Sequence, residues 1–135
     1  MTPARTLAVL ILVTSTTACA ATTYDTSIST ETLAPTTTVL PTGTAAELLP
    51  QLVTESAGLS ALIVNGGDKI ANVERMEALW AAVSAEVTNG DRDIANEINA
   101  QVVKSRAAAT FNRPAAADKV YTNLTALVKA YLATA

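Results

Sequence analysis

Apolar residues recur every three or four positions in four segments of the chain, which cover residues 44–64, 68–87, 91–109 and 114–133. This spacing puts the apolar side chains of each segment on one face of an α-helix. The connections between the segments are only a few residues long, so successive helices should lie side by side and antiparallel. The pattern therefore predicts an all-α fold over residues 44–135, a small up-down-up-down four-helix bundle.

Residues that favour helix ends stand at the borders of the first segment. Thr44 and Glu47 have the spacing of a capping box, and Asp68 is a good N-cap for the second segment. Gly66 and Gly67 should stop the first helix, with one of the two glycines able to take the left-handed conformation. Pro50 lies inside this segment and cannot donate a hydrogen bond to the carbonyl four residues earlier. We therefore expect the first helix to be kinked or broken near Pro50.

The later borders carry similar signals. Gly90 follows an asparagine and should end the second helix, Asp91 brings negative charge to the start of the third, and Pro114 suits the first turn of the fourth. The large residues of the predicted inward faces include Ile70, Leu79 and Trp80 in the second segment, and Tyr121, Tyr131 and Leu132 in the fourth. Aromatic side chains are enriched at binding hot spots as well as in cores. Trp80 is therefore predicted to be a core anchor, and Trp80, Tyr121 and Tyr131 are the possible partner-binding residues.

The first 18 residues have the layout of a signal peptide. Arg5 gives a positive start, residues 7–13 form an unbroken apolar run, and small residues follow as far as Ala18. This run is too short to span a bilayer, which takes roughly 20 apolar residues in a helix. We therefore expect residues 1–18 to direct export of the chain.

The only cysteine of the chain, Cys19, follows this segment directly. With Thr17 and Ala18 before it, Cys19 resembles the lipobox of bacterial lipoproteins, although Thr16 stands where that pattern usually has leucine. The resemblance covers residues 1–19 only and implies cleavage before Cys19, with a diacylglycerol on its sulfur. It thus implies a palmitate-bearing protein anchored in a membrane on the extracytoplasmic side of the bacterial cell envelope.

Two other readings of the same residues remain open. Ala18, Cys19 and Ala20 also fit the pattern of ordinary signal peptidase, which would cut before Ala21 and release a secreted protein. In the other, Cys19 is a small apolar residue of an uncleaved anchor.

A threonine-rich stretch separates Cys19 from the helical segments. Residues 22–44 contain ten threonines among 23 residues, two prolines, one glycine and no helical period. This composition is typical of a chain without a packed core. Residues 19–43 are therefore predicted to be a lipid-bearing, disordered linker, and the composition leaves open whether its threonines carry sugars.

The expected mature chain is acidic. Nine basic and twelve acidic residues are present in the full sequence, and loss of residues 1–18 removes only Arg5, which leaves a formal charge of −4. Nucleic-acid binding requires a basic surface, so no nucleic-acid partner is expected. A basic helix drawn to anionic lipid is disfavoured for the same reason.

The side chains available for catalysis are few. The chain has no histidine and one cysteine, so it lacks an ordinary zinc or haem site, an internal disulfide and a histidine base for a nucleophile. We expect no metal, no cofactor and no catalytic residue. Carboxylate pairs such as Glu74 and Glu77 are the remaining groups for acid/base chemistry.

These observations lead to a non-enzymatic, membrane-tethered envelope lipoprotein that acts as a binding or interaction module. Its partner, a protein or a small ligand, should bind near Trp80 or on the polar sides of the third and fourth segments. The alternative is a carboxylate-based enzyme or small-ligand binder, with Glu74, Glu77, Asn96 and Asn99 around a pocket between helices. A mainly structural envelope protein is the third possibility.

Overall fold

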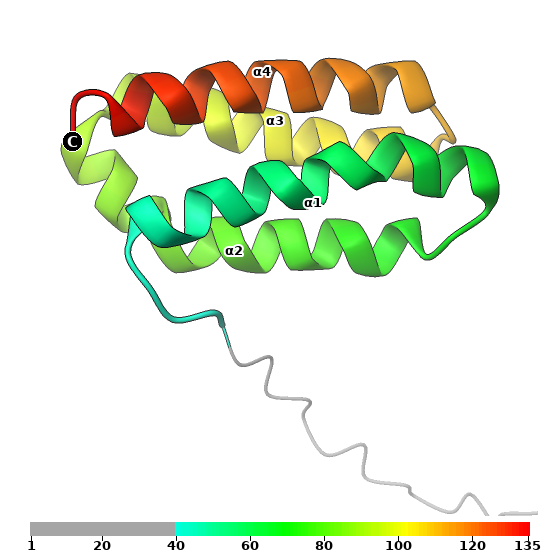
Figure 1. Cartoon of the computed structure of the whole chain (residues 1–135), viewed down its shortest axis with the longest axis horizontal. Coiled ribbons are helices and arrows are strands. Elements are labelled where there is room, and N and C mark those ends of the chain that lie inside the picture. The colour runs from blue at the N-terminus through cyan, green and yellow to red at the C-terminus, as the bar shows by residue number, and fades with distance from the viewer. Residues whose placement is uncertain (1–39) are drawn as a thin grey trace, which may run out of the picture. The chain divides into compact units, whose positions relative to one another are not determined.

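The computed structural model describes residues 40–135. The predicted signal peptide, Cys19 and the linker up to residue 39 lie outside the described residues. The described part forms four helices, α1 (Ala45–Asn65), α2 (Lys69–Gly90), α3 (Arg92–Thr110) and α4 (Pro114–Leu132), with no strand between residues 40 and 135 (Figure 1). The all-α prediction and its four helices are confirmed.

The helices form a ring of four. Helix α1 packs against α2 and α4, and α3 packs against α2 and α4, whereas the diagonal contacts are sparse. The α1–α2 and α3–α4 connections lie at one end of the bundle, and the α2–α3 connection lies at the other, beside the start of α1 (Figure 1). The predicted up-down-up-down order is therefore confirmed.

The core is built from aliphatic side chains of all four helices. Its largest fully buried members are Leu49, Leu52, Leu59, Met76, Ile98 and Leu124. On α3 and α4 several core positions hold alanine, including Ala108, Ala109 and Ala117. These small side chains allow the two helix backbones to approach closely.

Three residues of the predicted inward faces lie at the surface. Ile70, Tyr121 and Leu132 are 39%, 40% and 36% exposed. Tyr121 and Leu132 each follow a buried residue by one position, which rotates a side chain by about 100° around the helix and away from the core. Ile70 lies in the first turn of α2, at the end of the bundle, where fewer neighbours cover it.

The predicted N-caps are present. Thr44 and Glu47 form a capping box, in which the backbone N–H of Thr44 donates to the Glu47 carboxylate at 2.9 Å. The Asp68 carboxylate accepts from the backbone N–H of Ala71 at 3.0 Å. A further cap comes from a neighbouring helix, because the Ala45 N–H donates to the Glu86 carboxylate of α2 at 2.9 Å. This bond joins the start of α1 to the last part of α2.

Glycines mark the ends of α1 and α2. Gly66 ends α1 with φ of 70°, the left-handed conformation that glycine adopts at no steric cost. Of the kink or break expected near Pro50, the break does not occur, because α1 continues through this residue. Helix α2 ends at Gly90 as predicted, and Asp91 alone separates it from α3. Asp91 closes one helix through its N–H and opens the next through its carboxylate, which accepts from the Ile94 N–H at 3.0 Å.

None of the four helices over residues 45–132 combines the length and the apolarity needed to cross a membrane.

Candidate functional site

The three aromatic residues singled out in the sequence lie in different surroundings. Trp80 is 8% exposed, and its indole N–H donates to the Asn99 side-chain oxygen at 3.0 Å. Tyr131 is also buried, with its ring against Gly90. Tyr121 is exposed. Trp80 and Tyr131 thus belong to the core, and Tyr121 is the member of the set whose side chain a partner can reach.

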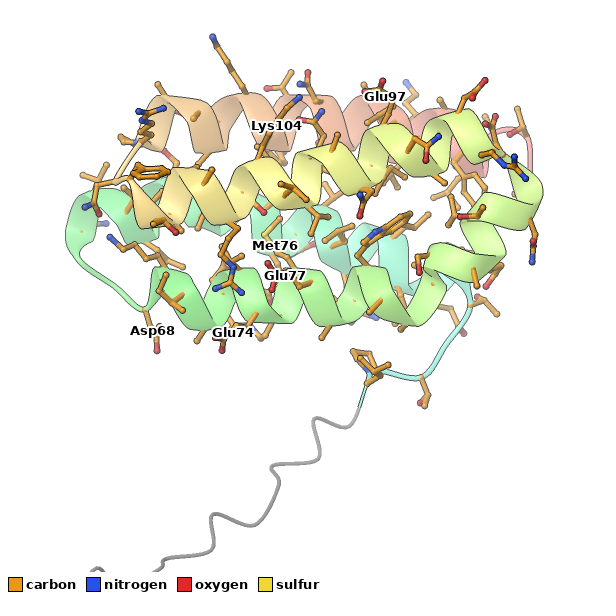
Figure 2. The ribbon with its side chains drawn as sticks, turned by 180° about the vertical axis from the view of Figure 1, so that it is seen from behind. Asp68, Glu74, Met76, Glu77, Glu97 and Lys104 are labelled. Carbon is orange, nitrogen blue, oxygen red and sulfur yellow. The ribbon has the colours of Figure 1, made fainter. Side chains whose placement is uncertain are left out.

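Glu74 and Glu77 of α2 lie in different surroundings. Glu77 lies on the side of α2 that faces α3, whereas Glu74 lies on the outer side (Figure 2). Arg106 of α3 binds Glu77 through two parallel bonds, of 2.9 Å from Nε and 2.5 Å from Nη2. The hydrogen bond from Arg106 lowers the pKa of Glu77 below its ordinary value, although burial acts in the opposite direction. Glu77 is therefore held as a carboxylate and is a poor proton donor near neutral pH.

The four polar residues of the carboxylate-based alternative do not converge. Glu74 and Glu77 border a shallow depression together with Leu40 and two alanines, Ala78 and Ala81. Asn96 and Asn99 do not line this depression, and Asn99 is engaged by Trp80. Within residues 40–135 no three acidic side chains gather in a way that would hold a metal ion.

Four polar residues are buried in the bundle, and the sequence pattern did not predict them: Ser56, Asn72, Gln101 and Ser105. The two serines donate to carbonyls of their own helices, at 2.7 Å and 2.6 Å, and so satisfy their hydroxyl groups locally. Asn72 donates to the backbone carbonyl and the carboxylate of Glu55, at 3.2 Å and 2.7 Å. Gln101 is the buried polar residue that also lines a surface groove.

This groove lies between α3 and α4, toward the end where the two helices are connected. Its cavity has a volume of about 340 Å³ and is lined by Gln101, Lys104, Ala107, Ala108, Arg113, Ala116, Lys119, Val120 and Asn123. The alanines and Val120 give it an apolar floor. Two amides lie along the floor, and the Asn123 Nδ2 donates to the Gln101 Oε1 at 3.3 Å. We call this cavity and its continuation along the helices the α3–α4 groove.

Three cations line the α3–α4 groove without a carboxylate partner. The ion pairs within residues 40–135 are Arg75–Glu55 and Arg106–Glu77, and neither includes Lys104, Arg113 or Lys119. The full chain has only nine basic residues and is acidic overall, so three of its cations gathered at one cavity form a local positive region. A concave site lined by charges of one sign attracts ligands of the opposite sign.

The groove continues past the two amides toward the middle of the bundle. Its second part is lined by Glu97, Gln101, Asn123, Ala126 and Leu127. Gln101 and Asn123 line both parts, so they lie between the cations and Glu97. Lys104 and Glu97 both lie along the edge of α3 that borders α4 (Figure 2). The groove therefore has a positive part, an amide pair and a negative part in sequence.

A second depression lies between α1 and α4. Its volume is about 510 Å³, and its lining residues are Pro50, Val53, Thr125, Val128, Lys129, Leu132 and Ala133. The lining is mostly apolar, and Lys129 is its one charged side chain. It lacks the converging polar groups that give a binding site its specificity.

Lys104, Lys119 and Gln101 were not among the residues that sequence reasoning selected. The groove is formed by α3 and α4, the helices of the third and fourth segments. Comparison of the chain with protein-family models, with curated proteins and with solved structures gives no match. The arguments for its function therefore rest on its own residues and geometry.

Proposed function

We propose that this chain is a non-enzymatic, lipid-anchored binding module of the bacterial cell envelope, and that it binds its ligand in the α3–α4 groove. The observation that carries the proposal is the gathering of Lys104, Arg113 and Lys119 around a cavity, without carboxylate partners among residues 40–135. Basic side chains that serve only the stability or solubility of a protein have no reason to gather around one cavity. A ligand with a negatively charged group would pair with these cations in the groove.

The carboxylate-based alternative has less support. Glu77 is engaged by Arg106, and Asn99 is engaged by Trp80. A general acid needs a pKa near the working pH, and the pKa of Glu77 is shifted in the opposite direction.

The anchor is supported by the resemblance of residues 1–19 to a lipoprotein signal. Its test is growth of producing cells with a palmitate analogue, followed by detection of label on the protein. The wild-type chain should be labelled and the Cys19→Ser variant should not. An unlabelled wild-type chain in the culture medium would favour cleavage before Ala21 and a secreted protein.

The binding role is tested by photo-crosslinking in intact cells. Ala107 lies in the groove and is exposed, so a benzophenone amino acid at this position should yield a crosslinked product. The matched control is Ala57, which is exposed on α1 outside the groove and should yield none. Equal products from both positions, or none from Ala107, would count against binding in the groove.

A further inference from the structure

We propose that the α3–α4 groove binds a short, extended peptide, with its carboxylate among Lys104, Arg113 and Lys119 and its amino group beside Glu97. The inference rests on the proposed function, because it names the ligand class of the same groove. Three features of the groove support it, namely its charges, its amide pair and its length.

The charges match a zwitterion in a fixed direction. The part of the groove near the α3–α4 connection has Lys104, Arg113 and Lys119, and the other part has Glu97. Hydrogen bonds between ionised groups are about twice as strong as neutral ones, and an arginine can bind a carboxylate through two of them. A simple anion would use only the positive part, and the opposite charge of Glu97 would contribute nothing to its binding.

The amide pair matches a peptide group. The Gln101 Oε1 accepts a hydrogen bond from Asn123. The Gln101 Nε2 donates no hydrogen bond to any group within residues 40–135. Gln101 is only 3% exposed and lines both parts of the groove, so a ligand there can reach its amide, whereas the rest of the residue is covered by protein. The Asn123 Oδ1 likewise accepts no hydrogen bond from the described residues. A peptide group offers a carbonyl for the first amide and an N–H for the second.

The length of the groove sets the length of the peptide. Glu97 and Lys104 are seven positions apart on α3, which corresponds to about 10 Å along the helix axis. An extended peptide advances about 3.3–3.6 Å per residue. A tripeptide therefore spans the distance from Glu97 to the cations, with its central residue over the amide pair.

The direct test uses trialanine as the probe. The purified full-length chain, labelled with ¹⁵N in mild detergent, is titrated while the side-chain amide signals of Gln101 and Asn123 are followed by NMR. We expect saturable shifts of both signals. The N-acetylated peptide lacks the ammonium and the C-terminally amidated peptide lacks the carboxylate, so each should bind roughly tenfold more weakly. Equal binding of all three peptides would overturn the proposed orientation, and no saturable binding would overturn the ligand class.

Inorganic phosphate separates a peptide site from a general anion site. We expect phosphate to bind at least roughly tenfold more weakly than trialanine, because it has no ammonium group to place beside Glu97. If phosphate bound as tightly as trialanine and shifted the same signals, the groove would be an anion site and the peptide proposal would be wrong.

Two lysine variants give a matched comparison. Lys104 lines the α3–α4 groove and Lys129 lines the depression between α1 and α4, and both side chains are exposed. Lys104→Gln should weaken trialanine binding roughly tenfold. Lys129→Gln removes the same charge from the chain and should leave the affinity unchanged. Equal losses would show that the overall charge, and not the groove, determines binding.

These results are independent of the crosslinking test of function. A crosslink from Ala107 without binding of trialanine would keep the proposed function and overturn the peptide as its ligand. The absence of both would overturn the function and the ligand together.

Discussion

Replacing Trp80 by alanine distinguishes a core residue from a residue kept for a partner. Its side chain is 8% exposed and lies between α2 and α3, where its N–H reaches Asn99. A large aromatic side chain buries about 150–250 Å², which corresponds to roughly 4–6 kcal/mol at about 25 cal/mol per Å². Truncations of this kind in protein cores cost about 3–5 kcal/mol. Since a domain of this size is stable by about 5–15 kcal/mol, Trp80→Ala should remove a large part of the free energy of unfolding.

The assay is urea unfolding of the full-length chain followed by circular dichroism at a helical wavelength, because the variant loses its tryptophan fluorescence. The contribution of the hydrogen bond is measured with a double-mutant cycle of Trp80→Phe and Asn99→Ala. Asn99 is exposed, so its removal creates little cavity, and we expect a coupling energy of about 1 kcal/mol. A loss below about 1 kcal/mol for Trp80→Ala would refute the argument that its burial stabilises the core.

Three further changes test the pH dependence and the ends of the helices. The folded pKa of Glu77 lies below its ordinary value of 4.5 because Arg106 binds it, so the pair stabilises the fold above that value and loses its effect as pH falls through the folded pKa. Glu77→Gln should therefore cost under about 1 kcal/mol at pH 7, since both side chains are over one-third exposed. The cost should shrink as the pH is lowered below 4.5, and a cost that is the same in acid would contradict this account. Gly66→Ala should cost about 1 kcal/mol in thermal unfolding because φ is 70°, and an unchanged midpoint would be the opposing result. Pro50→Ala should raise the free energy of unfolding by about 1–2 kcal/mol, because it restores a backbone N–H donor inside a continuous helix. Destabilisation in urea would show that the ring of Pro50 contributes more to stability than this backbone hydrogen bond would.

The local features of the fold could be predicted from the sequence because they depend on neighbouring residues. Asp68 and Gly66 act over a few positions, and the four helices follow from the apolar period alone. The surface positions of Tyr121 and Leu132 were missed because a wide apolar face in the sequence does not show how much of it the neighbouring helices cover.

The groove depends on residues that are distant in the sequence. Gln101 and Asn123 are joined across two helices, 22 positions apart, and the period of one helix does not reveal such a pair. A signal was present at Gln101, which follows Ile98 by three positions and precedes Ser105 by four, and so occupies an inward position of α3. A polar residue on the inward stripe of a helix with few apolar side chains is a sign of a buried polar contact.

The junction at Asp91 and the α3–α4 connection mark two different ends of the bundle. Leu40 and Thr44 lead the chain into α1 at the end where Asp91 joins α2 to α3 (Figure 1). The connection between α3 and α4, with Arg113 at the rim of the groove, lies at the opposite end, about 30 Å away along the helices. The entry of the chain into α1 and the positive rim of the groove thus form opposite poles of the bundle.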